Sequence, residues 1–119
     1  MIMSEIHYEL AHVGINGANP EEALAIAKLF ADMFRLPVKE GNSSDFAGAA
    51  VEVMKTPYKG RLGHIGVATP DCEAAMKDLE SRGYEFDLST AKYKPDGTLN
   101  AVYLKQEVGG FAVHIVKKP

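Results

Sequence analysis

The chain has 119 residues, of which 46% are hydrophobic and 24% charged, and its formal net charge is −3. This composition is typical of one soluble domain and offers no basic stripe for a nucleic-acid backbone, so no nucleic-acid partner is expected. No apolar run approaches the roughly 18 residues of a membrane span. The first ten residues lack the features of a signal peptide, so we expect a cytoplasmic protein without a membrane partner.

The first half of the sequence predicts a strand, a helix and a small antiparallel meander. A strand is expected over 8–16 and a helix over 20–34, because Asn19 is a good N-cap and Pro20 suits the first helical position. Apolar residues recur at helical spacing in this helix, namely Ala23, Ile26, Ala27, Phe30 and Phe34. Pro37 ends the helical segment, and the short strands of the meander are expected within 37–42, 44–49 and 50–56.

The second half repeats this order. A strand is expected over 61–69, followed by a helix that Thr69 caps, Pro70 starts and Gly83 closes. After the helix we expect a strand over 84–88, a polar loop over 89–98, and two strands over 99–108 and 109–118.

Cys72 is the single cysteine and lies in the second helix. No intramolecular disulfide is therefore possible, and no partner residue for a reactive thiol is suggested nearby. We interpret Cys72 as a small apolar residue of the helix.

The two halves are copies of one β-α-β-β-β unit. "HVGI" followed by "NPEEAL" corresponds to "HIGV" followed by "TPDCEA", and "VEVMK" corresponds to "VHIVK". Such an internal repeat decides the fold, so we expect a single domain, 1–119, with modules at about 8–56 and 61–117.

Four residues of the predicted strands share one face of the sheet. Side chains alternate along a strand, so His12, Glu52, His64 and His114 all lie opposite the branched aliphatic residues, and glycines leave room beside two of them. Three imidazoles and a carboxylate that converge are ligands for one divalent ion, Zn, Ni, Fe, Co or Mn. His7 precedes the first strand, and we interpret it as a surface residue.

These paired units resemble the vicinal oxygen chelate superfamily, which includes glyoxalase I, methylmalonyl-CoA epimerase, extradiol dioxygenases and bleomycin-resistance proteins. The resemblance covers about 8–117 and implies an α+β fold, in which two βαβββ modules form a cupped, curved mixed sheet with helices on its convex side. It places metal ligands on the first and last strands of each module, here His12, Glu52, His64 and His114. More narrowly, "LPVKEGNSS" and "VEVMKTPY" resemble a domain attached to some bacterial 2-keto-3-deoxy-6-phosphogluconate aldolases.

The resemblance also implies a reaction. Members bind two neighbouring substrate oxygens on the metal, which stabilises an oxyanion such as an enediolate. We expect a lyase or isomerase of the glyoxalase type that acts on a small oxo- or hydroxy-acid or an aldehyde adduct, with Glu52 as a ligand and the general base. Glyoxalase I and the epimerases usually carry a carboxylate where this chain has His114, which puts a glyoxalase I assignment in doubt.

Two alternatives stay open at this point. One is a dioxygenase, although a third histidine would occupy a coordination position that oxygen needs. The other is a non-catalytic metal- or ligand-binding module, or a regulatory module linked to sugar-acid metabolism. The resemblance implies a homodimer, and it leaves open whether the site lies within one chain or between swapped chains.

Basic and aromatic residues near the predicted site suggest an anionic small-molecule substrate. Arg61 and Lys105 are the expected contacts for an anionic tail, chosen from the basic residues near the predicted mouth, which are Lys55, Lys59, Arg61, Lys92, Lys94 and Lys105. Tyr103 and Met54 are expected to line the pocket.

Overall fold

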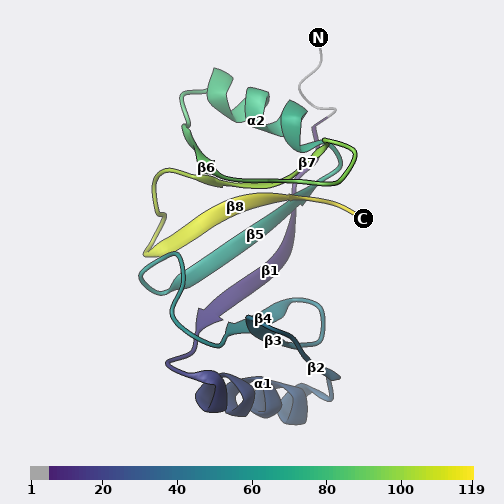
Figure 1. Ribbon diagram of the computed structural model, residues 1–119, viewed down its shortest axis with the longest axis vertical. Helices are drawn as coiled ribbons and strands as arrows, with labels where there is room; N and C mark the ends of the chain where they lie inside the picture. The colour runs from purple at the N-terminus through teal and green to yellow at the C-terminus, as the bar shows by residue number, and fades with distance from the viewer. Residues whose placement is uncertain (1–5) are drawn as a thin grey trace.

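A computed structural model describes residues 6–119, and it has an α+β fold with one sheet of eight strands (Figure 1). The predicted domain begins at residue 1, so its first five residues lie outside this range. The first half of the ten-residue segment that lacks signal-peptide features also lies outside it. In the first half the elements are β1 (Glu9–Asn16), α1 (Pro20–Phe34), β2 (Val38–Glu40), β3 (Ser44–Ala47) and β4 (Val51–Met54). In the second half they are β5 (Gly63–Thr69), α2 (Cys72–Ser81), β6 (Phe86–Tyr93), β7 (Leu99–Leu104) and β8 (Phe111–Lys117). Within the described range, neither helix has the length and apolar character needed to cross a membrane.

The strand order shows the repeat directly. The sheet runs β2-β3-β4-β1-β5-β8-β7-β6. In each half the first strand pairs in parallel with the last, β1 with β4 and β5 with β8, and the two first strands meet in antiparallel pairing at the centre. The four strands that carry the predicted ligands are therefore neighbours in the middle of the sheet.

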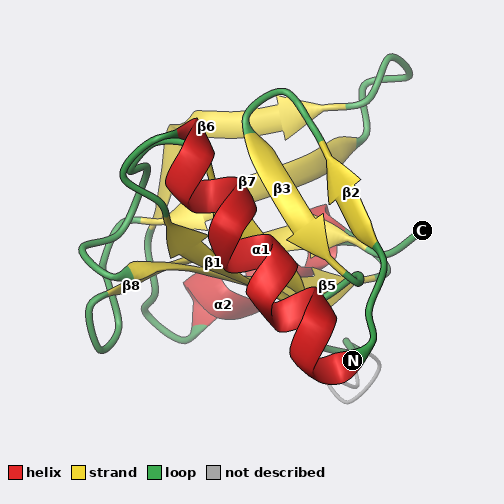
Figure 2. Cartoon of the chain, turned by 90° about the horizontal axis from the view of Figure 1, so that it is seen from below, coloured by secondary structure: helices red, strands yellow, loops and turns green. Residues whose placement is uncertain are grey.

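The two helices cover opposite ends of the sheet on its outer side. Helix α1 packs against β2, β3 and β4, and α2 packs against β7 and β8; Figure 2 views the molecule from the α1 end. Val53 of β4 is buried against Ala23 and Ala27, and Ile115 of β8 is buried against Cys72 and Ala75. Burial of these aliphatic faces is the main free-energy gain that holds each helix on the sheet.

The burial differs from the expected pattern at two places. Phe34, the last residue of α1, is 63% exposed, so the buried stripe of this helix ends before it. The outward-facing Val13, Ile65 and Val67 are only half-buried. They belong to β1 and β5, which lie between the two helices rather than under one of them (Figure 1).

The start of α1 is as predicted, whereas α2 begins later. The Asn19 side chain accepts a hydrogen bond from the Glu22 backbone N–H at 2.8 Å. In the second half, however, Asp71 is the N-cap and accepts from the Ala74 N–H at 3.1 Å, whereas Thr69 is the buried last residue of β5. The prediction of Thr69 as the cap is wrong, because the strand continues through that residue and an equally good capping side chain follows two positions later.

Asp71→Ala should lower the free energy of unfolding by about 1 kcal/mol, the usual effect of removing an N-cap acceptor. Asp71→Asn keeps an acceptor and is the matched control, with a smaller loss. Urea denaturation of the three proteins measures the difference. Equal stability of Asp71→Ala and the wild type would contradict the capping role.

The predicted polar loop over 89–98 is partly a strand. Strand β6 continues to Tyr93, and its register against β7 is interrupted, since Asp87 pairs with Tyr103 while Lys92 pairs with Ala101. Five residue steps on β6 thus correspond to two on β7, which is an enlarged bulge. The Thr90 hydroxyl closes it by donating to the Asp87 carbonyl at 2.7 Å and accepting from the Tyr103 N–H at 2.9 Å. The prediction failed here because the bulge residues are polar and break the alternation that marks a strand.

Candidate metal centre

The four predicted ligands meet on the inner face of the sheet. His64 Nε2 lies 3.0 Å from Glu52 Oε1, His12 Nε2 lies 3.5 Å from the same oxygen, and His114 Nε2 lies 3.1 Å from His12 Nε2. Each of the three imidazoles offers a nitrogen within 4.8 Å of the other two. They meet because β4, β1, β5 and β8 are consecutive in the sheet, and each strand carries one of the four at the same phase.

Two glycines make this convergence possible. The antiparallel register pairs His12 with Gly66 and Gly14 with His64, so each ring lies over the glycine of the neighbouring strand. A Cβ at Gly14 would lie 2.0 Å from His64 Cε1, and a Cβ at Gly66 would lie 2.4 Å from His12 Cε1. Any other residue at either position would therefore displace a histidine ring. The repeated His-x-Gly pattern is the sequence signal of this packing.

The donor atoms have the spacing of a metal shell. Ligand atoms about 2.1 Å from one ion and 90° apart lie about 3.0 Å from each other. The distances of 3.0, 3.1 and 3.5 Å among the donor atoms of the set are close to this value. Nδ1 of His64 is buried and has no hydrogen-bond partner among residues 6–119. Nε2 is therefore the nitrogen through which this ring acts.

The protonation states also suit a divalent cation. Burial lowers the pKa of His12, and burial together with the positive potential of His12 and His64 lowers the pKa of His114 to about 3. Burial opposes ionisation of Glu52, but hydrogen bonds from His64 and from the Ser44 hydroxyl, at 2.6 Å, outweigh it and lower the pKa of this carboxyl. Neutral imidazoles beside an ionised carboxylate are the forms that bind a metal.

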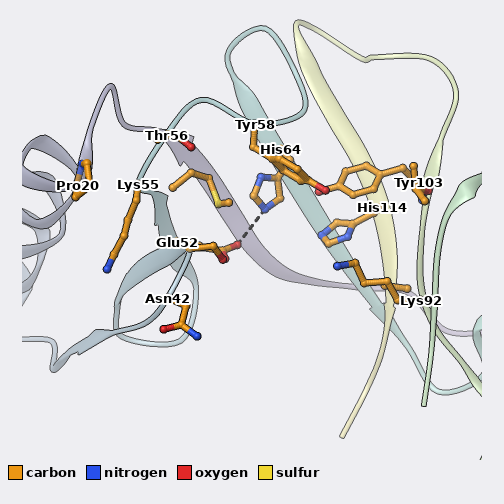
Figure 3. A pocket seen from close by; sticks show the side chains of 14 residues that line it. Pro20, Asn42, Glu52, Lys55, Thr56, Tyr58, His64, Lys92, Tyr103 and His114 are labelled. Atoms are coloured by element: carbon orange, nitrogen blue, oxygen red, sulfur yellow. Dashed lines mark hydrogen bonds and ion pairs between the residues drawn. The ribbon is translucent and has the colours of Figure 1, made fainter. Parts of the chain in front are cut away.

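A cavity of about 610 Å³ opens on these residues (Figure 3). Its wall is formed by Pro20, Asn42, Ser43, Glu52, Met54, Lys55, Thr56, Tyr58, His64, Thr90, Lys92, Ala101, Tyr103 and His114. Glu52 is the only carboxylate on this wall within the described part of the chain.

Tyr103 covers the histidines from one side. Its ring stacks on His114 with centroids 4.4 Å apart and an angle of 14°, and it meets His64 edge-on at 6.4 Å. The Lys59 ammonium lies 5.7 Å from the centre of the Tyr103 ring. Burial raises the pKa of the Tyr103 phenol above its ordinary value, so the hydroxyl stays protonated and can donate a hydrogen bond to a ligand oxygen.

The structure divides the four expected substrate contacts. Met54 and Tyr103 line the cavity, whereas Arg61 and Lys105 do not. Instead, Lys105 Nζ lies 3.3 Å from Glu85 Oε1, and both side chains are exposed. The Arg61 backbone N–H donates to Glu107 Oε1 at 3.5 Å, and neither basic residue is placed on the cavity wall.

Two lysines replace them on the wall of the cavity. Lys55 directly follows β4, and Lys92 lies in β6. Both were among the basic residues expected near the mouth of the site, but the sequence did not single out either one as a substrate contact. The place of Lys92 on the wall depends on the bulge in β6.

The structure agrees with the interpretations of His7 and Cys72. His7 is exposed and outside the cluster. Cys72 is 1% exposed, and burial raises the pKa of its thiol to about 11, so it is a packing residue of α2 rather than a nucleophile.

No family model matches the sequence, and comparison with curated proteins finds no match. Solved structures do match. A hypothetical protein from Bacillus halodurans superposes with a TM-score of 0.65 at 12% identity, over 94% of this chain and 95% of the other. A methylmalonyl-CoA epimerase from Streptomyces coelicolor, in complex with 2-nitronate-propionyl-CoA, gives 0.64 at 16% identity over 92% and 94%. The epimerase from Mycobacterium tuberculosis gives 0.61 at 17% identity over 92% and 87%. At these identities the likeness shows a shared fold: the chain has the same fold as these methylmalonyl-CoA epimerases.

Proposed function

We propose that this protein is a metal-dependent isomerase or lyase that binds an oxo- or hydroxy-acid through two neighbouring oxygens and moves a proton beside a carbonyl group. The convergence of three imidazoles and one carboxylate, made possible by Gly14 and Gly66, carries the proposal. His12, His64 and His114, with Glu52, would hold one divalent ion. When bound, such an ion supplies a Lewis acid that stabilises negative charge on a substrate oxygen.

The chain itself supplies the proton acceptor. Glu52 is the only carboxylate on the cavity wall among residues 6–119, and its lowered pKa keeps it ionised near neutral pH. The hydrogen bond from Ser44 holds its second oxygen, Oε2, and so fixes the direction of the carboxylate. A base held in this way can take a proton from the carbon next to a carbonyl.

The solved neighbours agree with this class of reaction. One epimerase structure holds methylmalonyl-CoA and another holds 2-nitronate-propionyl-CoA. Epimerisation beside a carbonyl requires the same removal and return of a proton. The support is at the level of the fold, and the substrate of this chain is a separate proposal.

Metal content tests the proposal directly. Protein purified without chelator should carry about one divalent ion per chain by mass spectrometry, and His64→Ala and His12→Gln should lose it. His12 is 15% exposed at its side chain, so its replacement tests the ligand role with less risk to folding than that of the buried His64. His7→Ala is the matched control and should keep the ion. Wild-type protein that binds none of Zn, Ni, Fe, Co or Mn on reconstitution would overturn the proposal.

A further inference from the structure

The cavity is larger than the chelated part of a substrate requires. Its volume of about 610 Å³ lies in the range of sites that enclose ligands of drug size, roughly 300–1,000 Å³. The two chelated oxygens and the carbons that carry them would fill only a small part of this volume. Figure 3 shows Lys55 and Lys92 on opposite sides of the Glu52–His64 pair. The cavity therefore extends away from the metal centre toward each lysine.

The two lysines differ in their charge environment. Lys55 Nζ lies 3.9 Å from Asp45 Oδ1, and Asp45 is 1% exposed with no hydrogen-bond partner for either oxygen among the described residues. The positive charge of Lys55 is thus offset by a buried negative one. Asn42 and Thr56, which are uncharged, complete this side of the cavity.

Lys92 has no such partner. Lys92 is exposed, and within residues 6–119 it forms no ion pair, whereas Lys105 and Lys118, which are also exposed, pair with Glu85 and Glu9. The bulge in β6 places Lys92 opposite Ala101, and both residues line the cavity. A bulge that redirects a side chain next to a site is a recurrent device of sheets. Lys92 is therefore the unpaired cation of the cavity wall.

We propose that Lys92 binds a second anionic group of the substrate. The substrate would then be an oxo- or hydroxy-acid with a carboxylate or phosphate at the end remote from the two chelated oxygens. This inference rests on the proposed function, because the metal centre fixes the other end of the ligand.

The strength of the contact gives the size of the effect. A hydrogen bond between an ammonium and an anion in a half-enclosed site contributes enough to change affinity by about tenfold to a hundredfold. Metal-loaded wild-type protein should therefore bind 2-oxoglutarate at least tenfold more tightly than 2-oxopentanoate, which has a methyl group in place of the distal carboxylate. A second pair of probes, 3-phosphoglycerate and glycerate, makes the same comparison for phosphate.

Isothermal titration with these four acids and with oxalate tests the inference. In Lys92→Met the preference within each pair should disappear, while the affinities for oxalate and 2-oxopentanoate stay unchanged. Lys105→Met, which removes a lysine outside the cavity, should keep the preference. The pair with the larger preference identifies carboxylate or phosphate as the distal group.

Failure of this inference and failure of the proposed function give different results. Oxalate binding to the metal-loaded protein, without a preference in either pair, would overturn the role of Lys92 and leave the metal-centred function standing. A preference that persists in Lys92→Met would do the same. Binding of none of the five probes, oxalate included, would overturn both.

Discussion

Gly66→Ala is expected to lose bound metal while most of the fold remains. A Cβ at this position would lie 2.4 Å from Cε1 and 2.7 Å from Nε2 of His12, closer than real side-chain contacts allow. The His12 side chain is 15% exposed, so its ring has space to swing away from the added methyl group. A displaced ring no longer presents its nitrogen to the other ligands. We expect the metal affinity to fall at least about 100-fold, since disturbing even the groups that orient ligands costs 10- to 100-fold.

The stability cost should be smaller than the binding cost. Overpacking a well-packed site costs about 1–3 kcal/mol, measured by urea denaturation of the metal-free protein. Gly14→Ala should be more severe, because His64 is 2% exposed and its ring has no room to move. In that variant both metal and stability are lost.

Gly97→Ala separates the two effects. Gly97 has a φ of +88° and nothing within 4 Å of an added Cβ, so the substitution strains the backbone without touching the site. It should lose about 1 kcal/mol of stability and bind metal as the wild type does. Competition with a chromophoric chelator measures all three variants. Wild-type affinity in Gly66→Ala would show that the ring does not depend on the glycine beneath it.

The convergence of the four candidate ligands could be predicted from the sequence because it depends on strand periodicity and on the repeat. His12, Glu52, His64 and His114 need only a period of two and the repeat to fall on one face, and both features are visible in the letters. The positions of Gly14 and Gly66 belong to the same pattern. Strands β1 and β5 both carry His-x-Gly, and their antiparallel pairing places the histidine of each strand over the glycine of the other strand. The His-x-Gly repeat therefore indicates both the pairing register of β1 with β5 and the face of the sheet on which the histidines lie.

The cavity wall was predicted less well because it depends on irregular backbone. Arg61 and Lys105 were expected to bind the substrate as basic residues near the mouth, but neither lies on the cavity wall, and Lys105 pairs with Glu85. Lys92 faces the cavity only because Asp87 and Thr90 close a bulge before it, through side-chain to backbone hydrogen bonds that no alternation of polarity reveals. Such local bonds compete with the regular ladder and are set by the folded context.

Other expectations concern features beyond one folded chain. In the described chain the four ligands come from the same molecule, so the site does not require exchange of strands between copies. The homodimer, the cytoplasmic location and the narrower resemblance to the aldolase-linked domain stay predictions.

Glu52→Gln should lower turnover far more than it lowers metal content. The amide keeps an oxygen that can face the ion, and the Ser44 hydroxyl can still hydrogen-bond to the side chain. A neutral amide cannot accept the substrate proton, however, and general-base catalysis contributes about 10²- to 10⁴-fold to rate. Exchange of the protons beside the carbonyl of 2-oxoglutarate for solvent deuterium, followed by NMR, reports this step whatever product the reaction forms.

The controls assign the role of the carboxylate. Glu85→Gln changes an exposed carboxylate outside the cavity and should exchange protons at the wild-type rate. Ser44→Ala leaves the base in place but frees its second oxygen, so its rate should lie between those of the wild type and Glu52→Gln. Parallel loss of metal and exchange in Glu52→Gln would make this residue a ligand only. Metal-loaded wild-type protein that binds 2-oxoglutarate and exchanges no protons would be a binding module rather than an enzyme, because the bound acid would then lie beside an ionised carboxylate that never takes its proton.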